Sequence, residues 1–112
     1  MTDQINDQAS ADTTVDITQQ QTITVIFEES GLPDNVNWSV SVNNYTYSGT
    51  SPNSIEVTLP AGSYTWKAND VDINTGTGEY CYYYPTSSTQ SGTVSSSTTV
   101  NIVYTLYKCV TV

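Results

Sequence analysis

Residues 5–17 alternate between apolar or small side chains and polar ones, which is the pattern of a β-strand with one buried face. The apolar or small face consists of Ile5, Ala9, Ala11, Thr13, Val15 and Ile17. Polar residues fill the even positions, and Asp7 is the one break. Such a strand would be roughly 40 Å long at about 3.3 Å per residue. Because the rest of the chain reads as a complete β-domain, this strand has no partner of its own, which predicts pairing with another molecule.

The remainder of the chain shows no convincing helical period, and Val, Thr, Tyr and Ile dominate its alternating runs, so we predict an all-β fold. The expected strands cover about 22–28, 36–42, 45–49, 54–59, 63–68 and 79–84, with a final hairpin of 91–95 and 98–110. A Gly-rich loop is expected at 69–78. Short strands with turn signals every 8–12 residues or so predict a β-sandwich. The predicted organisation is therefore a tail and hinge at 1–20 and one sandwich at 21–112.

Each predicted strand has one apolar face that should point into the core. The inward positions are Ile23, Val25, Phe27, Val36, Trp38, Val40, Val42, Ile55, Val57, Leu59, Tyr64, Trp66 and Ala68. In the last strand Val100, Ile102, Tyr104 and Leu106 share one face. These residues are numerous enough for an ordinary small core.

The chain of 112 residues carries a formal net charge of −9, with only two Lys or Arg and no His. Nucleic acid and anionic membrane surfaces both select for basic patches, so neither is an expected partner. Charged residues make up only 12% of the chain, and Ser, Thr, Asn and Gln supply most of the polar surface. Such a surface keeps its character when carboxylates are protonated, so we expect the protein to be stable in acid.

Two cysteines and two N-glycosylation sequons indicate an extracellular protein. Cys81 and Cys109 are expected to form an intramolecular disulfide, while a free thiol or an intermolecular bridge stays possible. The sequons start at Asn37 and Asn44, so N-linked glycans are expected there. The first residues have neither the basic start nor the apolar core of a secretory signal, and no stretch is long and apolar enough to span a bilayer. We therefore expect a mature form from which a signal has been removed, without membrane insertion.

Several short motifs occur in a characteristic order. They are Phe27-x-Glu29-x-Gly31-Leu32-Pro33, Trp38-Ser39-Val40, Leu59-Pro60-Ala61-Gly62-Ser63-Tyr64, Tyr84-Pro85 and a late hairpin at Gly92. Over about 22–107 the chain resembles the immunoglobulin-like β-sandwich module of archaeal cell-surface proteins, which is also appended to thermopsin-like acid proteases. The alternating tail is similar to the donor strand of archaeal thread-like surface filaments and of chaperone-assembled pilins. The resemblance implies donor-strand assembly, and because it does not extend to a protease portion it implies no enzymatic activity.

Catalytic and metal-binding patterns are weak. Triads and dyads that need His are excluded by composition. Asp12-Thr13-Thr14 is only a faint echo of the Asp-Thr-Gly of aspartic proteases. Residues 70–76 resemble a calcium loop, but the positions for Gly and for the final acidic ligand hold Thr75 and Cys81. A solvated loop is the better interpretation, and no cofactor, metal or enzymatic activity is expected.

The tyrosines at 80 and 82–84 have two interpretations, a carbohydrate platform or ordinary core and cross-strand packing, of which packing is the commoner. Lys108 falls in the apolar phase of its strand and is interpreted as a residue at the edge of the sandwich; an isopeptide bond to an Asn is the other possibility. Lys67 is interpreted as a solvated strand residue.

Two functions from different classes are compatible with the sequence. The first is a structural subunit of an extracellular filament, in which each tail completes the sandwich of the next copy and so forms a homopolymer. The second is a non-catalytic accessory module that binds carbohydrate or a surface layer. The alternation in residues 5–17 favours the filament, because a plain linker has no reason to alternate.

Overall fold

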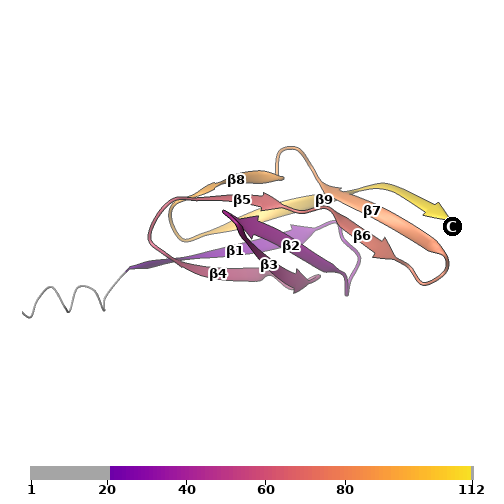
Figure 1. Ribbon diagram of the computed structural model, residues 1–112, viewed down its shortest axis with the longest axis horizontal. Coiled ribbons are helices and arrows are strands. Elements are labelled where there is room, and N and C mark those ends of the chain that lie inside the picture. Colours follow the sequence, from indigo (N-terminus) through magenta and orange to yellow (C-terminus); the bar gives the residue numbers. More distant parts are fainter. Residues whose placement is uncertain (1–20, 112) are drawn as a thin grey trace, which may run out of the picture.

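The computed structural model describes residues 21–111, and these residues form nine β-strands without a helix. The strands are β1 (Thr22–Ser30), β2 (Asn37–Val42), β3 (Tyr45–Thr50), β4 (Ile55–Pro60), β5 (Tyr64–Ala68), β6 (Val71–Asn74), β7 (Glu79–Pro85), β8 (Ser91–Val94) and β9 (Thr98–Thr111). Figure 1 shows how they are layered. The all-β prediction is confirmed. The predicted donor strand falls in residues 1–20 and lies outside the described residues.

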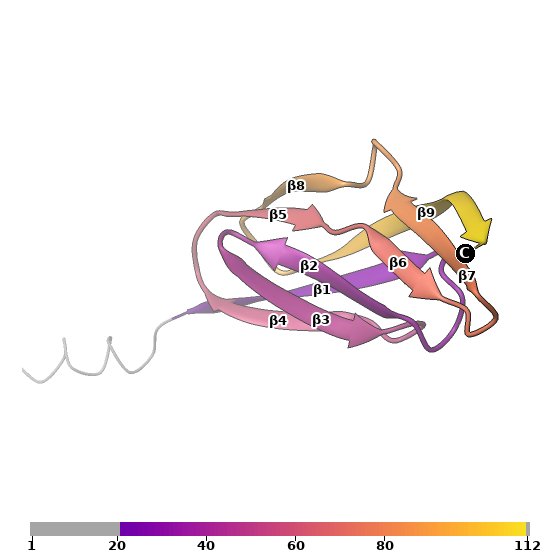
Figure 2. The same cartoon turned by 45° about the vertical axis from the view of Figure 1, so that its right-hand side comes forward.

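The strands form two sheets, as expected for a β-sandwich. A five-stranded sheet has the order β4-β1-β9-β7-β6, and a four-stranded sheet has the order β3-β2-β5-β8. Neighbouring strands are antiparallel except β1 and β9, which run parallel, with Val25 opposite Thr98 and Ser30 opposite Val103. Figure 2 shows the two layers from an oblique angle. The parallel pair fixes the direction in which β9 continues beyond β1.

The core lies between the two sheets and is built from the predicted inward faces. Val25, Phe27, Val40 and Ile102 are fully buried, and Trp38 is 2% exposed. The rings of Phe27 and Trp66 meet edge to face across the sheets, with centroids 5.7 Å apart. Burial alternates along β1 and β2, so period-2 patterning located these faces correctly. Each such large apolar side chain contributes roughly 1.5–3 kcal/mol when it leaves water.

The predicted loop at 69–78 is wrong in its first half, because residues 71–74 form β6 at the edge of the five-stranded sheet. Val71 is buried and Ile73 is half-buried, while Asp72 between them is exposed. The turn that follows is real: Gly76 and Gly78 both have positive φ, which glycine adopts without steric cost. The strand was not predicted because Asp72 faces solvent from the edge of the sheet, which made the segment look like a polar loop.

The predicted hairpin of 91–95 and 98–110 is also wrong. β8 pairs with β5 in the four-stranded sheet, whereas β9 pairs with β1 and β7 in the five-stranded sheet. The short connection at 95–97 therefore crosses between sheets instead of turning within one. The short separation in sequence favoured a hairpin, but β8 and β9 form their backbone hydrogen bonds with strands of different sheets.

β9 extends past β1. β1 borders β9 only up to Val103, and β7 borders it from Tyr104 to Thr111. On the side of β9 that faces away from β7, residues 104–111 have no strand partner within the described part of the chain. We call this free side the open edge of β9. Because β1 and β9 are parallel, it lies at the opposite end of the molecule from the start of β1, next to the end marked C in Figure 1.

Leu106 was predicted to point into the core, but this prediction is wrong because its side chain is 48% exposed. A bulge shifts the register so that Lys108 lies opposite Tyr82 and Leu106 opposite Tyr83, with Tyr107 as the extra residue. The alternation of buried residues in β9 stops after Tyr104, where pairing with β1 has also ended. An apolar side chain is therefore left at the open edge.

Candidate functional site

The open edge of β9 is the first element of the candidate site. A strand edge presents backbone N–H and C=O groups that pair readily with another strand. Exposed large apolar side chains gather on the same strand: Leu106 is 48% exposed and Tyr107 65%. Natural proteins usually protect such an edge by shortening, twisting or covering it. An open edge that also carries apolar side chains is therefore suited to strand addition.

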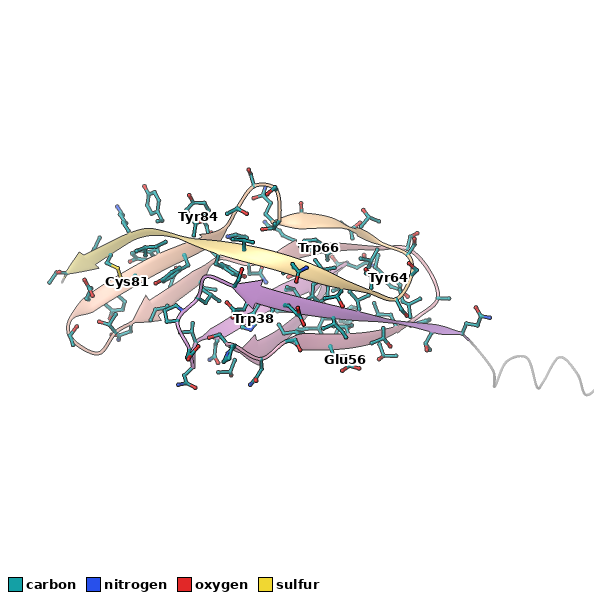
Figure 3. The ribbon with its side chains drawn as sticks, turned by 180° about the vertical axis from the view of Figure 1, so that it is seen from behind. Trp38, Glu56, Tyr64, Trp66, Cys81 and Tyr84 are labelled. Carbon is teal, nitrogen blue, oxygen red and sulfur yellow. A yellow bond between two sulfur atoms is a disulfide. The ribbon has the colours of Figure 1, made fainter. Side chains whose placement is uncertain are left out.

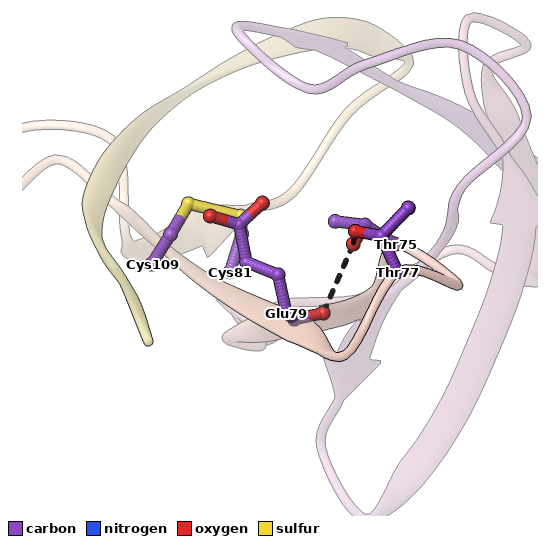
Figure 4. Close-up of a disulfide and its surroundings, with 5 residues drawn as sticks. All are labelled: Thr75, Thr77, Glu79, Cys81 and Cys109. Atoms are coloured by element: carbon purple, nitrogen blue, oxygen red, sulfur yellow. Dashed lines mark hydrogen bonds between the residues drawn. A yellow bond between two sulfur atoms is a disulfide. The ribbon is translucent and has the colours of Figure 1, made fainter. Parts of the chain in front are cut away.

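The disulfide lies in this extension. Cys81 and Cys109 are directly opposite one another on β7 and β9, with their Cα atoms 4.0 Å and their sulfurs 2.10 Å apart. Figure 4 shows the bond joining the two strands. The predicted pairing is confirmed. Since β7 is the one strand that borders β9 here among the described residues, the disulfide holds in place the segment that carries the open edge.

Glu79 lies beside the disulfide, and its carboxylate and the two sulfurs are within 4.8 Å of one another. The backbone carbonyl of Glu79 accepts hydrogen bonds from the N–H and the hydroxyl of Thr75, which closes the β6–β7 turn. A metal-binding cysteine must be a thiolate. Because both sulfurs are in the disulfide, this cluster does not serve as a metal site.

The second element is a groove across the end of the five-stranded sheet, with a volume of about 450 Å³. We call it the tyrosine groove, and it is lined by Asp70, Asp72, Tyr82, Tyr83, Tyr84, Tyr107, Lys108 and Val110. β6 and the residue before it, Asp70, give the acidic side, β7 gives the central tyrosines and β9 the far side. Cys81 and Pro85 are buried, so Tyr82 and Tyr84 alternate onto the outer face of the sheet. Figure 3 shows Tyr84 and Cys81 at this end, away from Trp66 and Tyr64.

Tyr107 contacts two other residues that line the groove, Tyr84 and Lys108. Its ring and that of Tyr84 are 6.3 Å apart with an interplanar angle of 71°, an edge-to-face contact. The Lys108 ammonium lies 5.4 Å from the centroid of the Tyr107 ring, within range of a cation–π interaction. Asp72, Tyr82 and Lys108 are successive partners across β6, β7 and β9. The groove thus has acidic, aromatic and basic groups in that order.

Only part of this groove is evident from the sequence. The tyrosine run has two interpretations there, a carbohydrate platform or the commoner packing, and neither of them includes Tyr107, Asp70 or Asp72. Tyr84 is 41% exposed, while Tyr82 and Tyr83 are half-buried. Tyr107 comes from a strand more than twenty residues later, so only the β7–β9 register brings it here. The usable signal was that Tyr82 and Tyr84 have the same parity, which places them on one face.

The calcium-loop pattern at 70–76 does not form a coordinating loop. Residues 71–74 are extended in β6, which spreads Asp70, Asp72 and Asn74 along a strand. The Asn74 side chain instead accepts a hydrogen bond from the Gly76 N–H at 2.9 Å, in the turn after β6. The segment is a strand followed by a turn, so the predicted solvated loop is wrong for residues 71–74.

Both predicted glycosylation residues are exposed. Asn37 begins β2 and its side-chain oxygen Oδ1 accepts a hydrogen bond from the Thr50 hydroxyl at 3.3 Å, while Asn44 lies in the β2–β3 turn. Neither side chain contributes to the core, so both are accessible from solvent. Glycosylation at these residues stays a prediction. Lys67 is exposed, in agreement with its interpretation as a solvated residue. Lys108 is also exposed, on the part of β9 that carries the open edge.

The predicted donor-strand residues all fall outside the described residues, as does Asp12. Their alternation therefore remains an observation on the sequence. The structure does fix where residue 21 joins the domain, since β1 begins at Thr22. The preceding chain is thus attached at the end of the sandwich opposite the open edge of β9.

Comparison of the chain with protein-family models, with curated proteins and with solved structures found no match. Among residues 21–111, no helix is long and apolar enough to cross a membrane.

Proposed function

We propose that this protein is a structural, non-enzymatic subunit of an extracellular, archaeal-type surface filament. The domain would be an immunoglobulin-like sandwich, and residues 5–17 of one copy would pair as a donor strand with the open edge of β9 in the next. The observation that carries the proposal is the open edge itself, a strand segment that has no partner on this side among residues 21–111 and that carries the exposed Leu106 and Tyr107. Strand addition at a sheet edge is a general mode of protein association.

The two ends of the domain are placed for head-to-tail assembly. The tail is attached where β1 begins, and the open edge lies where β9 ends, at the opposite end. A donor strand that runs parallel to β9 would continue the row of β1 and lead directly into its own β1 farther along. Every copy would then point the same way. Such an interface does not close on itself, so it generates a fibre and not a ring.

The chemistry of the two partners is complementary. On a donor strand, the odd positions from Ala9 to Ile17 would lie on the face of Leu106, and the even polar positions would join the solvated face. The open edge at 104–111 is about 26 Å long at about 3.3 Å per residue, and residues 5–17 would span roughly 40 Å. The later part of the tail is therefore sufficient to cover the open edge, and the earlier part would reach toward Gly31.

The location is supported by the disulfide, because structural disulfides persist in oxidising surroundings such as the cell exterior. A formal net charge of −9 and the mainly uncharged polar surface suit a component exposed to an acidic medium.

The test is polymerisation of tail variants of the full chain, observed by negative-stain electron microscopy and sedimentation. Val15→Asp and Ile17→Asp would each place a charge on the buried face of the donor strand, so both should abolish filaments while leaving the thermal unfolding of the domain unchanged. Thr14→Asp is the matched control, since it adds the same charge on the opposite face and should still polymerise. Normal filaments from both Val15→Asp and Ile17→Asp would refute the proposal.

A further inference from the structure

We propose that the tyrosine groove is a binding site for a neutral oligosaccharide. This site lies on the outer face of the five-stranded sheet and adjoins the open edge of β9, with which it shares Tyr107, Lys108 and Val110. The groove volume of about 450 Å³ is in the usual range for small-molecule sites.

The first reason is the exposure of aromatic surface. Tyr84 is 41% and Tyr107 65% exposed, and exposed aromatic residues that cluster in a concave site usually mark a binding surface. The two rings meet edge to face, and both side chains keep a large exposed fraction beside the groove. Tyrosine offers an apolar ring with an electron-rich face and a polar tip, at a low cost in conformational entropy. Sugar rings are complementary, since they present C–H groups on their faces and hydroxyls on their edges.

The second reason is the balance of charge across the groove. Asp70 and Asp72 lie on the β6 side, and Lys108 lies on the β9 side above Tyr107. An anionic ligand would meet the two carboxylates and the strong negative charge of the whole chain, whereas a cationic ligand would meet the Lys108 ammonium. A hydroxyl both donates and accepts, so it can bond to carboxylates, phenols and an ammonium in the same site. These groups therefore favour a neutral polyhydroxylated ligand.

The third reason is that the polar surface continues past the groove. A neighbouring groove of about 300 Å³ also has Asp70 and Asp72 in its wall. The rest of its lining is mostly small and polar and consists of Asn37, Trp38, Ser39, Thr46, Ser48 and Val71. The two carboxylates thus stand between two grooves at the β6 edge. An extended ligand could cross from one groove to the other, so we infer a chain of several sugar units rather than a monosaccharide.

The experiment is saturation-transfer NMR on the full chain. The probes are the neutral hexasaccharides cellohexaose, mannohexaose and maltohexaose, with a hyaluronan hexasaccharide as the anionic comparison. Saturation transfer to at least one neutral probe is expected, with a weaker signal for hyaluronan. Tyr107→Ala and Tyr84→Ala should each weaken that binding about tenfold. Tyr45→Ala is the matched control, because Tyr45 is 71% exposed on β3 and does not line the tyrosine groove.

A second variant separates loss of binding from loss of folding. Asp72→Asn changes one exposed side chain in β6 without removing bulk, and it should weaken the neutral probe about threefold while leaving the unfolding temperature unchanged. Absence of saturation transfer from every neutral probe at millimolar concentration would overturn the proposal. So would binding that survives unchanged in Tyr107→Ala and Tyr84→Ala, or hyaluronan binding stronger than that of all neutral probes.

Discussion

The hydroxyl of Tyr104 donates a hydrogen bond of 2.8 Å to the backbone carbonyl of Asn69, in the connection between β5 and β6. The Tyr104 ring also meets Trp38 edge to face, with centroids 6.4 Å apart. Tyr104 is 3% exposed and directly follows Val103, the last residue of β9 that pairs with β1. One buried tyrosine thus anchors the start of the open edge to both sheets.

This tyrosine should make the domain sensitive to alkali. Burial, followed by the charges of Asp70 and Glu29, raises the pKa of Tyr104 well above its ordinary value. The unfolded chain ionises its tyrosines near pH 10, whereas folding keeps Tyr104 neutral. The stabilisation is therefore complete below about pH 10 and is lost as the pH rises above it toward the folded pKa. Urea unfolding at pH 9, 10 and 11 should show a free energy of unfolding that falls over this interval.

Tyr104→Phe tests whether ionisation of Tyr104 causes the loss of stability in alkali. The variant loses one hydrogen bond and should be less stable than the parent by about 1 kcal/mol at pH 7, because the Asn69 carbonyl is left without this donor. Its loss of stability between pH 9 and pH 11 should be smaller than that of the parent. Tyr45→Phe, at an exposed position, should change neither quantity. An unaltered pH dependence in Tyr104→Phe would show that another group is responsible.

Gly31 should tolerate no side chain. Its φ is +97°, and a Cβ added there would overlap the backbone carbonyl oxygen of Tyr104. Gly31→Ala therefore combines backbone strain with a clash, and we expect a loss of about 2–5 kcal/mol in the free energy of unfolding. Gly76→Ala is the matched control, since Gly76 has a φ of +85° but open space around it. It should cost only about 1–2 kcal/mol in the same urea titration, and equal losses for both variants would contradict the clash.

The Cys81–Cys109 disulfide should stabilise the extension more than the core. Cys81→Ser/Cys109→Ser should lower the free energy of unfolding by about 2–4 kcal/mol. Hydrogen exchange should rise most in residues 105–111, where β9 has only β7 as a neighbour, and least at Phe27 and Ile102 in the core. Uniform loss of protection across both sheets would instead mean that the bond supports the whole domain.

Alternation along the chain was enough to place most strands and their inward faces. Trp38 and Phe27 are buried as predicted because each belongs to a strand whose one face is covered by the other sheet. The same rule failed at Leu106, where the bulge opposite Tyr83 and the end of pairing with β1 leave the side chain exposed. Periodicity indicates which residues share a face, but the tertiary arrangement decides whether that face is covered.

The candidate site depended more on register than on local pattern. The disulfide was predictable, because two cysteines allow only one intramolecular pairing. The tyrosine groove was not, since Asp72, Tyr82 and Lys108 become neighbours only when β6, β7 and β9 are paired. β6 itself was not predicted, because its one acidic residue, Asp72, lies on the solvent face of an edge strand. Cross-strand partners that are distant in sequence leave no periodic signal in a single chain.

The proposed filament interface has two halves, the tail and the open edge of β9, and a single substitution should block each one separately. Leu106→Asp should block the open edge with a charge while leaving the tail intact, because Leu106 is already 48% exposed and adds little to the core. Val15→Asp should block the tail while leaving the open edge intact. Neither variant alone should polymerise.

In a mixture, the tail of the Leu106→Asp chain can still enter the open edge of the Val15→Asp chain, and no further copy can be added. Analytical ultracentrifugation should therefore show monomers for each variant and a 1:1 dimer for the mixture. Tyr45→Asp, which adds the same charge on the other sheet, should still form filaments. Filaments from Leu106→Asp alone, or a mixture that stays monomeric, would show that the tail and the open edge of β9 are not partners.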